Sequence, residues 1–212
     1  MPKHLTSLLG SPLFLWTLLA LPSVGMVASG LDYGQVMHAS GEFSARLLIL
    51  SLAVSPLLSL FPGRAWGRWL LRRRRWIGVA AFGYGVLHTL FYLMEVGAWS
   101  AVADDLMEAG IWTGWLAFLL FVPPALTSND RSVRRLGRRW KPLQRMVYGA
   151  ALLTLLHWAL VADHWLPALV NFAPLVLLKL AQVLTGTRAR GVFNYLTDVL
   201  SNISHTTRSK SS

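Results

Sequence analysis

Long uninterrupted runs of apolar residues constrain this chain more than any other feature of its sequence. Hydrophobic residues make up 54% of the 212 residues, and the mean hydropathy is +0.48. Several runs reach the roughly 18–20 apolar residues that a helix needs to cross about 30 Å of hydrocarbon. The strands of a membrane β-barrel would instead alternate in pieces of about 10 residues. The sequence therefore predicts an all-α, multi-pass membrane protein.

Six apolar segments are predicted to be transmembrane helices. They are residues 8–28, 43–61, 76–97, 107–127, 146–162 and 165–184. Together they predict one domain over residues 1–187, followed by a polar and mobile tail over residues 188–212. The first run resembles the apolar region of a signal peptide but is longer than the usual 7–15 or so residues, so we expect a retained first helix, with cleavage as the alternative.

Charged residues alternate between the predicted loops. The loops after the second and fourth segments are rich in base: Arg64, Arg68, Arg72, Arg73, Arg74, Arg75, Arg131, Arg134, Arg135, Arg138, Arg139, Lys141 and Arg145. The loops after the first and third segments carry acid and no base: Asp32, Glu42, Glu95, Asp104, Asp105 and Glu108. The positive-inside rule then places both termini and both basic loops in the cytoplasm. Topology and contact with anionic membrane lipid account for the net charge of +11, so nucleic acid is not an expected partner.

Two histidines lie deep within apolar segments, where ionisable side chains are functional candidates. His88 follows Arg75 by 13 residues in the third segment, and His157 follows Arg145 by 12 in the fifth. At 1.5 Å per residue, both lie ~18–20 Å from the inner layer of charge. Paired imidazoles at one depth suit the axial positions of a six-coordinate haem, placed between helices three and five. An interhelical hydrogen bond, a proton relay and a zinc site are alternatives, although zinc usually takes three or four protein ligands.

Neighbouring residues are compatible with a flat macrocycle between the two helices. Small residues lie one and two turns below each histidine: Gly78, Ala81, Gly83, Gly85, Gly149 and Ala150. The same residues also allow two helices to pack directly. Arg46, near the outer end of the second segment, is expected either to pair with a haem propionate or to extend to the interface. His38 is expected to be a surface histidine or a second propionate contact. Cysteine is absent, which excludes disulfides, iron–sulfur clusters and thiolate ligation of haem.

Three stretches resemble a known family. They are "HASGEFSARLLILSLAVSPL" (38–57), "RRWIGVAAFGYGVLHTLFYL" (74–93) and "RRLGRRWKPLQRMVYGAALLTLLHW" (134–158). The chain resembles, over residues 35–184, the MsrQ family, which supplies the haem-binding membrane subunit of the bacterial periplasmic methionine-sulfoxide reductase system. That family belongs to the ferric-reductase-like transmembrane superfamily.

The resemblance implies that His88 and His157 are the iron ligands of haem b. The chain departs from the family at Gln144, where the usual pattern has a histidine 13 residues before the outer ligand. An amide is a poor iron ligand compared with imidazole, so one haem is expected. Gln144 is instead a possible contact of bound FMN or quinone.

The resemblance also implies a role in the bacterial inner membrane. Electrons would enter from a cytoplasmic flavin reductase or a membrane quinol. They would leave to a periplasmic molybdopterin enzyme that repairs methionine sulfoxide. The chain would then be an electron-transfer subunit of an oxidoreductase rather than an enzyme by itself. The alternatives are a ferric-reductase-like or quinol-oxidising cytochrome with another acceptor, and a haem-free transporter or scaffold.

Overall fold

The computed structural model describes residues 11–162 and 164–186, and most of these residues are helical, with short connections between the helices. The helices are α2 (Pro12–Ala28), α3 (Tyr33–Leu60), α4 (Ala65–Val96), α5 (Trp99–Asp105), α6 (Ala109–Leu126), α7 (Asp130–Leu136), the 3-10 turn Gly137–Arg139, α8 (Trp140–Val161) and a C-terminal helix, Leu166–Gly186. No strand occurs in these two ranges. The predicted all-α class is confirmed, whereas the predicted tail, residues 188–212, lies outside the described residues.

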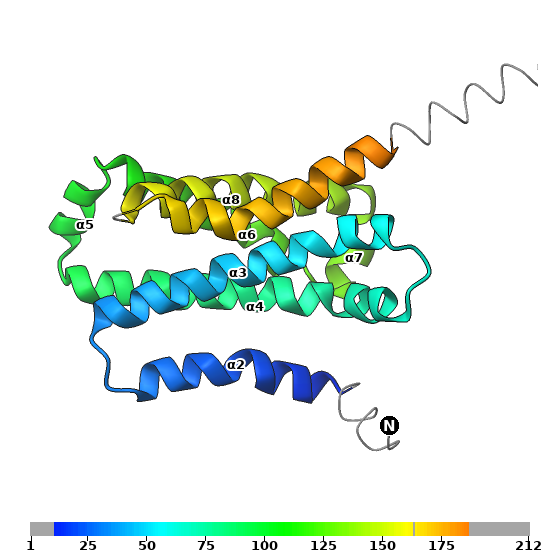
Figure 1. The fold of residues 1–212 in the computed structure, drawn as a ribbon. Helices are drawn as coiled ribbons and strands as arrows, with labels where there is room; N and C mark the ends of the chain where they lie inside the picture. Colours follow the sequence, from blue (N-terminus) through cyan, green and yellow to red (C-terminus); the bar gives the residue numbers. More distant parts are fainter. Residues whose placement is uncertain (1–10, 163, 187–212) are drawn as a thin grey trace, which may run out of the picture.

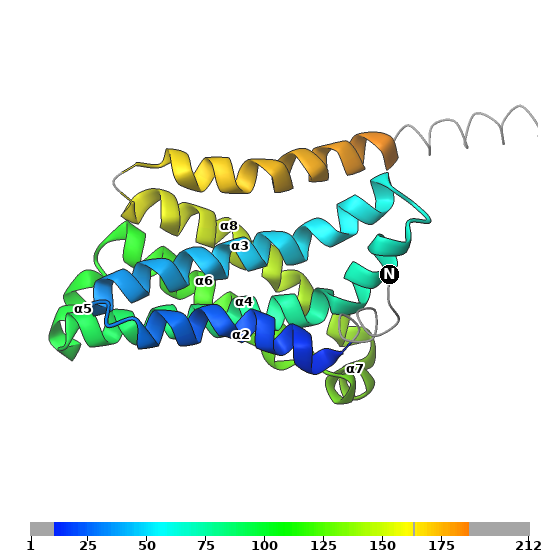
Figure 2. The same ribbon diagram turned by 60° about the horizontal axis from the view of Figure 1, so that its bottom comes forward.

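Six of these helices run side by side as a bundle (Figure 1). Two antiparallel hairpins, α3–α4 and α6–α8, form its centre. Helix α2 packs on the outer side of the first hairpin, and the C-terminal helix covers α3 and α8 on the opposite side (Figure 2). Helices α5 and α7 are short and lie in the connections at opposite ends of the bundle.

Each of the six predicted segments overlaps one helix, and residues 8–10 of the first segment lie outside the described residues. Four of the described helices, α3, α4, α6 and the C-terminal one, are long and apolar enough to cross a membrane. Within α2, Phe14–Ala28 is a shorter apolar helix. Helix α8 has 22 residues but carries Gln144, Arg145 and His157, which lower its hydropathy. A multi-pass helical protein is therefore supported, and the number of six crossings stays a prediction.

Helix α3 begins ten residues before the predicted segment, at Tyr33. Its N-cap is Asp32, whose carboxylate accepts a hydrogen bond of 2.7 Å from the backbone N–H of Gln35. An Asp at this position satisfies a donor that has no partner within the helix. The polar stretch between Gln35 and Glu42 hides this helix from a search for apolar runs. Its first two turns nevertheless matter, because they reach the site described below.

Helix α4 contains the whole arginine block that the sequence analysis placed in a loop. The connection is only the turn before Arg64, the N-cap, and the helix starts at Ala65. The loop prediction for residues 65–75 is therefore wrong. Arginine is a good helix former, so the end of an apolar run does not end the helix.

The core lies where α3, α8 and the C-terminal helix meet. Its buried members include Leu48 and Leu52 on α3, Ala150 on α8, and Ala168 and Phe172 on the C-terminal helix. Many large apolar side chains instead point outward along α2, α8 and the C-terminal helix, and the outward-facing leucines and valines among them are 43–65% exposed. An apolar exterior of this kind is suited to a bilayer rather than to water.

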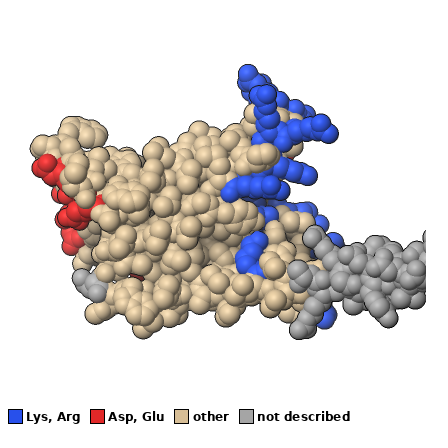
Figure 3. Space-filling model, turned by 90° about the horizontal axis from the view of Figure 1, so that it is seen from above, with Lys and Arg blue, Asp and Glu red and all other residues tan. Residues whose placement is uncertain are grey.

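Charge separates along the bundle axis. Lysine and arginine gather at one end, and aspartate and glutamate at the other (Figure 3). At the basic end, Arg75 Nη1 on α4 lies 2.5 Å from Asp130 Oδ1 at the start of α7. The hydrogen bond and positive charge of Arg75 hold the pKa of the Asp130 carboxyl below its ordinary value. This asymmetry in the fold matches the alternation of charge between the predicted loops.

Arg74 binds the two helices of the first hairpin together at the same end. Its Nε donates to the carbonyl oxygen of Ser51 at 2.9 Å, and its Nη1 donates to Ser55 Oγ at 2.9 Å. The acceptors lie five residues and one residue before Pro56, which has no N–H to bond the carbonyl of Leu52 within α3. The guanidinium therefore joins the two helices close to the turn where α3 lacks one of its own hydrogen bonds.

We expect Arg74→Ala to lower the stability of the purified protein by about 2 kcal/mol, because hydrogen bonds from a charged group are lost from a half-buried position. Thermal unfolding in detergent measures this. Arg72→Ala is the matched control on the same helix, where the side chain is exposed, and should leave the melting temperature unchanged. Equal melting temperatures for the two variants would contradict the bracing role of Arg74.

Candidate functional site

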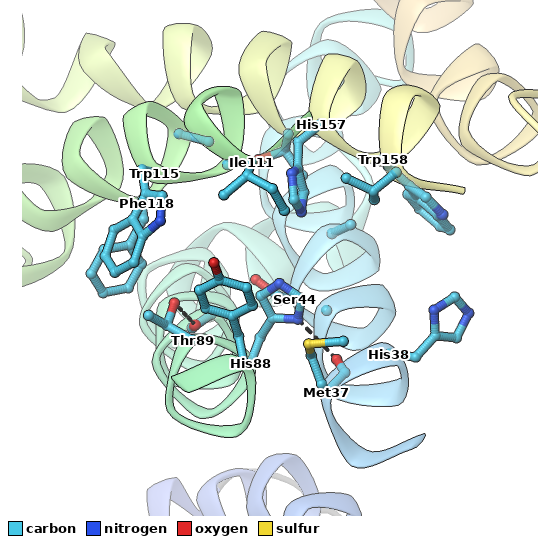
Figure 4. Close-up of a pocket in the computed structure, with 18 of the residues that line it drawn as sticks. Met37, His38, Ser44, His88, Thr89, Ile111, Trp115, Phe118, His157 and Trp158 are labelled. Carbon is cyan, nitrogen blue, oxygen red and sulfur yellow. Dashed lines mark hydrogen bonds between the residues drawn. The ribbon is translucent and has the colours of Figure 1, made fainter. Parts of the chain in front are cut away.

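A cavity of about 380 Å³ lies between the two central hairpins, toward the acidic end of the bundle. All four helices of the hairpins contribute to its wall (Figure 4). The wall is largely apolar, with Trp115 and Phe118 from α6 on one side. His88 and His157 both line it, and His38, Glu42 and Glu95 lie at its rim. Cofactor sites have volumes of this order and the same mixture of apolar wall and few polar groups.

Each deep histidine is held by a backbone carbonyl of the partner helix in its hairpin. His88 Nδ1, on α4, lies 2.8 Å from the carbonyl oxygen of Met37 on α3. His157 Nδ1, on α8, lies 2.7 Å from the carbonyl oxygen of Gly110 on α6. A carbonyl oxygen only accepts, so Nδ1 of each neutral ring carries the hydrogen and donates. Each Nε2 is left with its lone pair, the state in which imidazole binds a metal.

The two imidazoles face one another across the cavity (Figure 4). Their ring centroids are 5.9 Å apart, and the ring planes make an angle of 79°. Metal–imidazole bonds of about 2 Å place two rings on opposite sides of one metal with centroids about 6 Å apart. The spacing therefore fits two axial ligands of a single iron, one from each hairpin.

The donor set fits haem better than a bare metal ion. No group of three or more His, Cys, Asp or Glu side chains able to hold a metal ion occurs among residues 11–162 and 164–186. A protein zinc site normally needs at least three such ligands. Two imidazoles satisfy haem iron, because the porphyrin supplies the other four nitrogens.

His38 and Arg46, the two predicted propionate contacts, are separate from the pair of deep histidines. His38 and Arg46 are both joined to Glu42, with His38 Nε2 3.4 Å from Glu42 Oε1 and Arg46 Nη2 2.6 Å from Glu42 Oε2. Arg46 Nε also lies 3.4 Å from Asn171 Oδ1 on the C-terminal helix. His38 is at the cavity rim with 69% of its side chain exposed, and Arg46 is not part of the cavity wall. Residues 38, 42 and 46 are four residues apart, and this spacing predicts that their side chains meet on one face of a helix.

Gln144 lies far from the cavity, near the basic end of α8. Its Nε2 donates to the carbonyl oxygen of Pro124 and to Thr127 Oγ1, both at 3.0 Å. Thirteen residues of helix, about 20 Å, separate it from His157. In this structure the amide connects α8 to the end of α6.

Sequence reasoning missed several residues that shape the site. The acceptors at Met37 and Gly110 use only backbone atoms, so no side-chain pattern could have revealed them. Tyr92 also lines the cavity, and its hydroxyl donates to Asp105 Oδ2 at 2.8 Å, which joins α4 to the short helix α5. Its ring packs edge-on against Trp115, with centroids 6.4 Å apart. Tyr92 lies four residues after His88, and this spacing places the two side chains on the same face of the helix.

Residues 40–155 match the family model described as the ferric reductase like transmembrane component. A protein of Azospira oryzae is 43% identical over 122 residues, which cover 56% of this chain and 51% of that protein. Proteins of Brucella ovis and Brucella canis are 37% identical over 142 residues, which cover 66% of this chain and 62% of theirs. All three are named protein-methionine-sulfoxide reductase heme-binding subunit MsrQ.

The expected resemblance to the MsrQ proteins is confirmed by these relatives. The chain spans between about half and three-fifths of the length of the relatives it matches. No solved structure matches it at a significant level. The matched region contains both hairpins of the site except for the last residues of α8 and the first turns of α3, and so it leaves out His157.

Proposed function

This chain belongs to the ferric-reductase-like transmembrane family, and on that premise we propose that it is a b-type cytochrome subunit of the bacterial inner membrane. In this proposal it passes electrons from a cytoplasmic or quinol donor to a periplasmic molybdopterin methionine-sulfoxide reductase. The haem and the methionine-sulfoxide reductase in this proposal are taken from the names of its relatives, which are called heme-binding subunits of that reductase.

The observation that carries the proposal is the pair of facing imidazoles. His88 and His157 come from different hairpins, face one cavity and have ring centroids 5.9 Å apart. The carbonyl oxygens of Met37 and Gly110 hold the Nδ1 hydrogens, which leaves each Nε2 free to bind iron. A haem bound there supplies a one-electron couple, and the apolar wall excludes water from it.

Charge and position give the proposed direction of transfer. The cavity lies toward the acidic end of the bundle, which is the outer side if the positive-inside rule holds. His88 is about 20 Å from the arginines at the basic end. We therefore place a relay, FMN or a quinone, between the cytoplasmic donor and the haem. The exposed arginines are a suitable dock for a phosphate-bearing flavin or an acidic reductase.

The family match also supports a second candidate function. A ferric-reductase-like or quinol-oxidising cytochrome would use the same two histidines with another acceptor. A third hypothesis is that the two histidines belong to a haem-free transporter or scaffold. The experiments below separate these possibilities.

Protein purified in detergent should show a Soret band that shifts when dithionite is added. His88→Ala and His157→Ala should each lose the low-spin bis-histidine spectrum, because each removes one axial nitrogen. His164→Ala, at an exposed position outside the helices, is the control and should keep the wild-type spectrum. A colourless but folded preparation would exclude both hypotheses in which the protein is a cytochrome.

The expected haem content depends on Gln144. A pyridine haemochrome assay should give one haem per chain, since Gln144 is bonded to the end of α6 and an amide is a poor iron ligand compared with imidazole. A value of two haems per chain would show that other ligands exist and that the assignment is incomplete.

The proposed topology can be mapped directly because the chain has no cysteine. In intact spheroplasts, a membrane-impermeant maleimide should label Asp104→Cys, at the acidic end. Arg138→Cys, at the basic end, should react only after the membrane is permeabilised. The reverse pattern of labelling would overturn the orientation and, with it, the direction of electron flow.

The acceptor can be identified by reconstitution. Reduced protein in liposomes should be reoxidised when a periplasmic molybdopterin methionine-sulfoxide reductase and its sulfoxide substrate are added together. Omitting the sulfoxide substrate is the control, because the acceptor enzyme cannot then turn over and takes up only the few electrons that its own redox centre stores. Oxidation by ferric chelates or quinones, but not by this enzyme, would favour the second candidate function.

A further inference from the structure

Two glycines lie against the rings of the two deep histidines. A Cβ atom added at Gly41, on α3, would be 2.7 Å from His88 Nδ1 and 3.0 Å from His88 Cε1. A Cβ atom added at Gly114, on α6, would be 2.6 Å from His157 Nδ1 and 2.8 Å from His157 Cε1. Ordinary contacts of a Cβ atom begin at 3.4 Å. Any other residue at either position would therefore displace the imidazole or the helix.

The position of each glycine follows from the hydrogen bond beside it. Gly41 lies four residues after Met37, and Gly114 lies four residues after Gly110. In an α-helix, the side chain of residue i+4 lies over the carbonyl oxygen of residue i, which is why Ser and Thr so often bond back to it. Thr154 Oγ1 does so on α8, donating to the carbonyl oxygen of Ala150 at 2.8 Å. The imidazole takes the same place at Met37 and Gly110, and so residue i+4 must have no Cβ.

The ring has no alternative place that keeps this bond. Imidazole is rigid, and its Nδ1 lies 2.7–2.8 Å from the carbonyl oxygen. Restoring a contact of about 3.4 Å at Gly41 would require a shift of about 0.7 Å, which exceeds the tolerance of about 0.5 Å for a working site. The shift would push the ring into the cavity and stretch the hydrogen bond that fixes its tautomer.

The arrangement occurs once in each central hairpin. Each has a carbonyl acceptor and a glycine one turn apart on its first helix, and a histidine on its second. In each, the alanine seven residues before the histidine, Ala81 or Ala150, is fully buried at the helix contact. Among the described glycines, a histidine ring is the nearest neighbour of an added Cβ only at Gly41 and Gly114. A Cβ at Gly110 would instead meet Val161 Cγ1 at 2.8 Å, and one at Gly34 would make only ordinary contacts of 3.5–3.7 Å.

We propose that Gly41 and Gly114 are positioning residues for the two haem ligands. Each allows one imidazole to lie against the helix backbone with Nδ1 on a carbonyl and Nε2 toward the cavity. This inference rests on the proposed function for its effect on haem, but its steric part concerns only the protein's own residues.

Haem titration of the apo protein tests the effect on the ligands. Gly41→Ala and Gly114→Ala should each weaken haem binding by about 10–100-fold, the usual effect of a lost supporting contact, and should convert part of the low-spin spectrum to high spin. Gly34→Ala, on α3, is the matched control and should resemble the wild type. If all three variants bind haem alike and stay low-spin while His88→Ala does not, the positioning role is wrong and the proposed function stands. If the wild type binds no haem, the proposed function fails instead.

A double-mutant cycle on the apo protein tests the steric part without haem. Gly41→Ala should lower the melting temperature in the wild-type background, although alanine is the better helix former. It should not do so in the His88→Ala background, because the ring that it would contact is gone. His157→Ala is the mismatched control and should not relieve the loss. An equal loss in all three backgrounds would overturn the proposal, and a Gly41→Ala variant that folds only together with His88→Ala would support it.

Discussion

Everything at the site depends on one interaction made twice, a hydrogen bond from a histidine Nδ1 to a backbone carbonyl of the neighbouring helix. The carbonyls of Met37 and Gly110 lie within helices, and each also accepts a hydrogen bond from the hydroxyl three residues later, Ser40 Oγ at 3.0 Å and Thr113 Oγ1 at 2.7 Å. Such a bond requires two helix backbones to come close. Close approach in turn requires small residues, and this explains Gly41 and Gly114 beside the rings and Gly110 against Val161.

The bundle places this interaction asymmetrically along its axis. The cavity opens near Glu42 and Glu95, at the acidic end, while Arg74 and Arg75 tie helices together at the basic end. A bilayer core is too apolar to tolerate unpaired polar groups, and the described part of the chain has no buried side-chain nitrogen or oxygen without a partner. The two ends therefore differ in what they hold: the basic end braces the hairpins, and the acidic half carries the histidines.

The sequence allowed the fold class and the positions of the long helices to be predicted. Apolar runs mark helices that face lipid, and the similar distances from Arg75 and Arg145 predict that His88 and His157 lie at about one depth. The polar start of α3 was missed, since its helical turns depend on the Asp32 cap and not on hydropathy. The bonding of Gln144 to α6 was also missed, because it is a tertiary contact. The pairing of Arg46 with Glu42 was missed although their four-residue spacing within α3 indicates it.

Contacts within the two hairpins fix how the imidazoles lie. Each ring is bonded within its own hairpin, so its tautomer and orientation do not depend on the contact between the hairpins. Packing then brings the rings to 5.9 Å with planes at 79°. Side chains that are already ordered lose little conformational freedom on binding, and a pre-organised site converts more of its contacts into affinity. Two hydrogen bonds and two glycines thus order His88 and His157 through contacts of the protein alone.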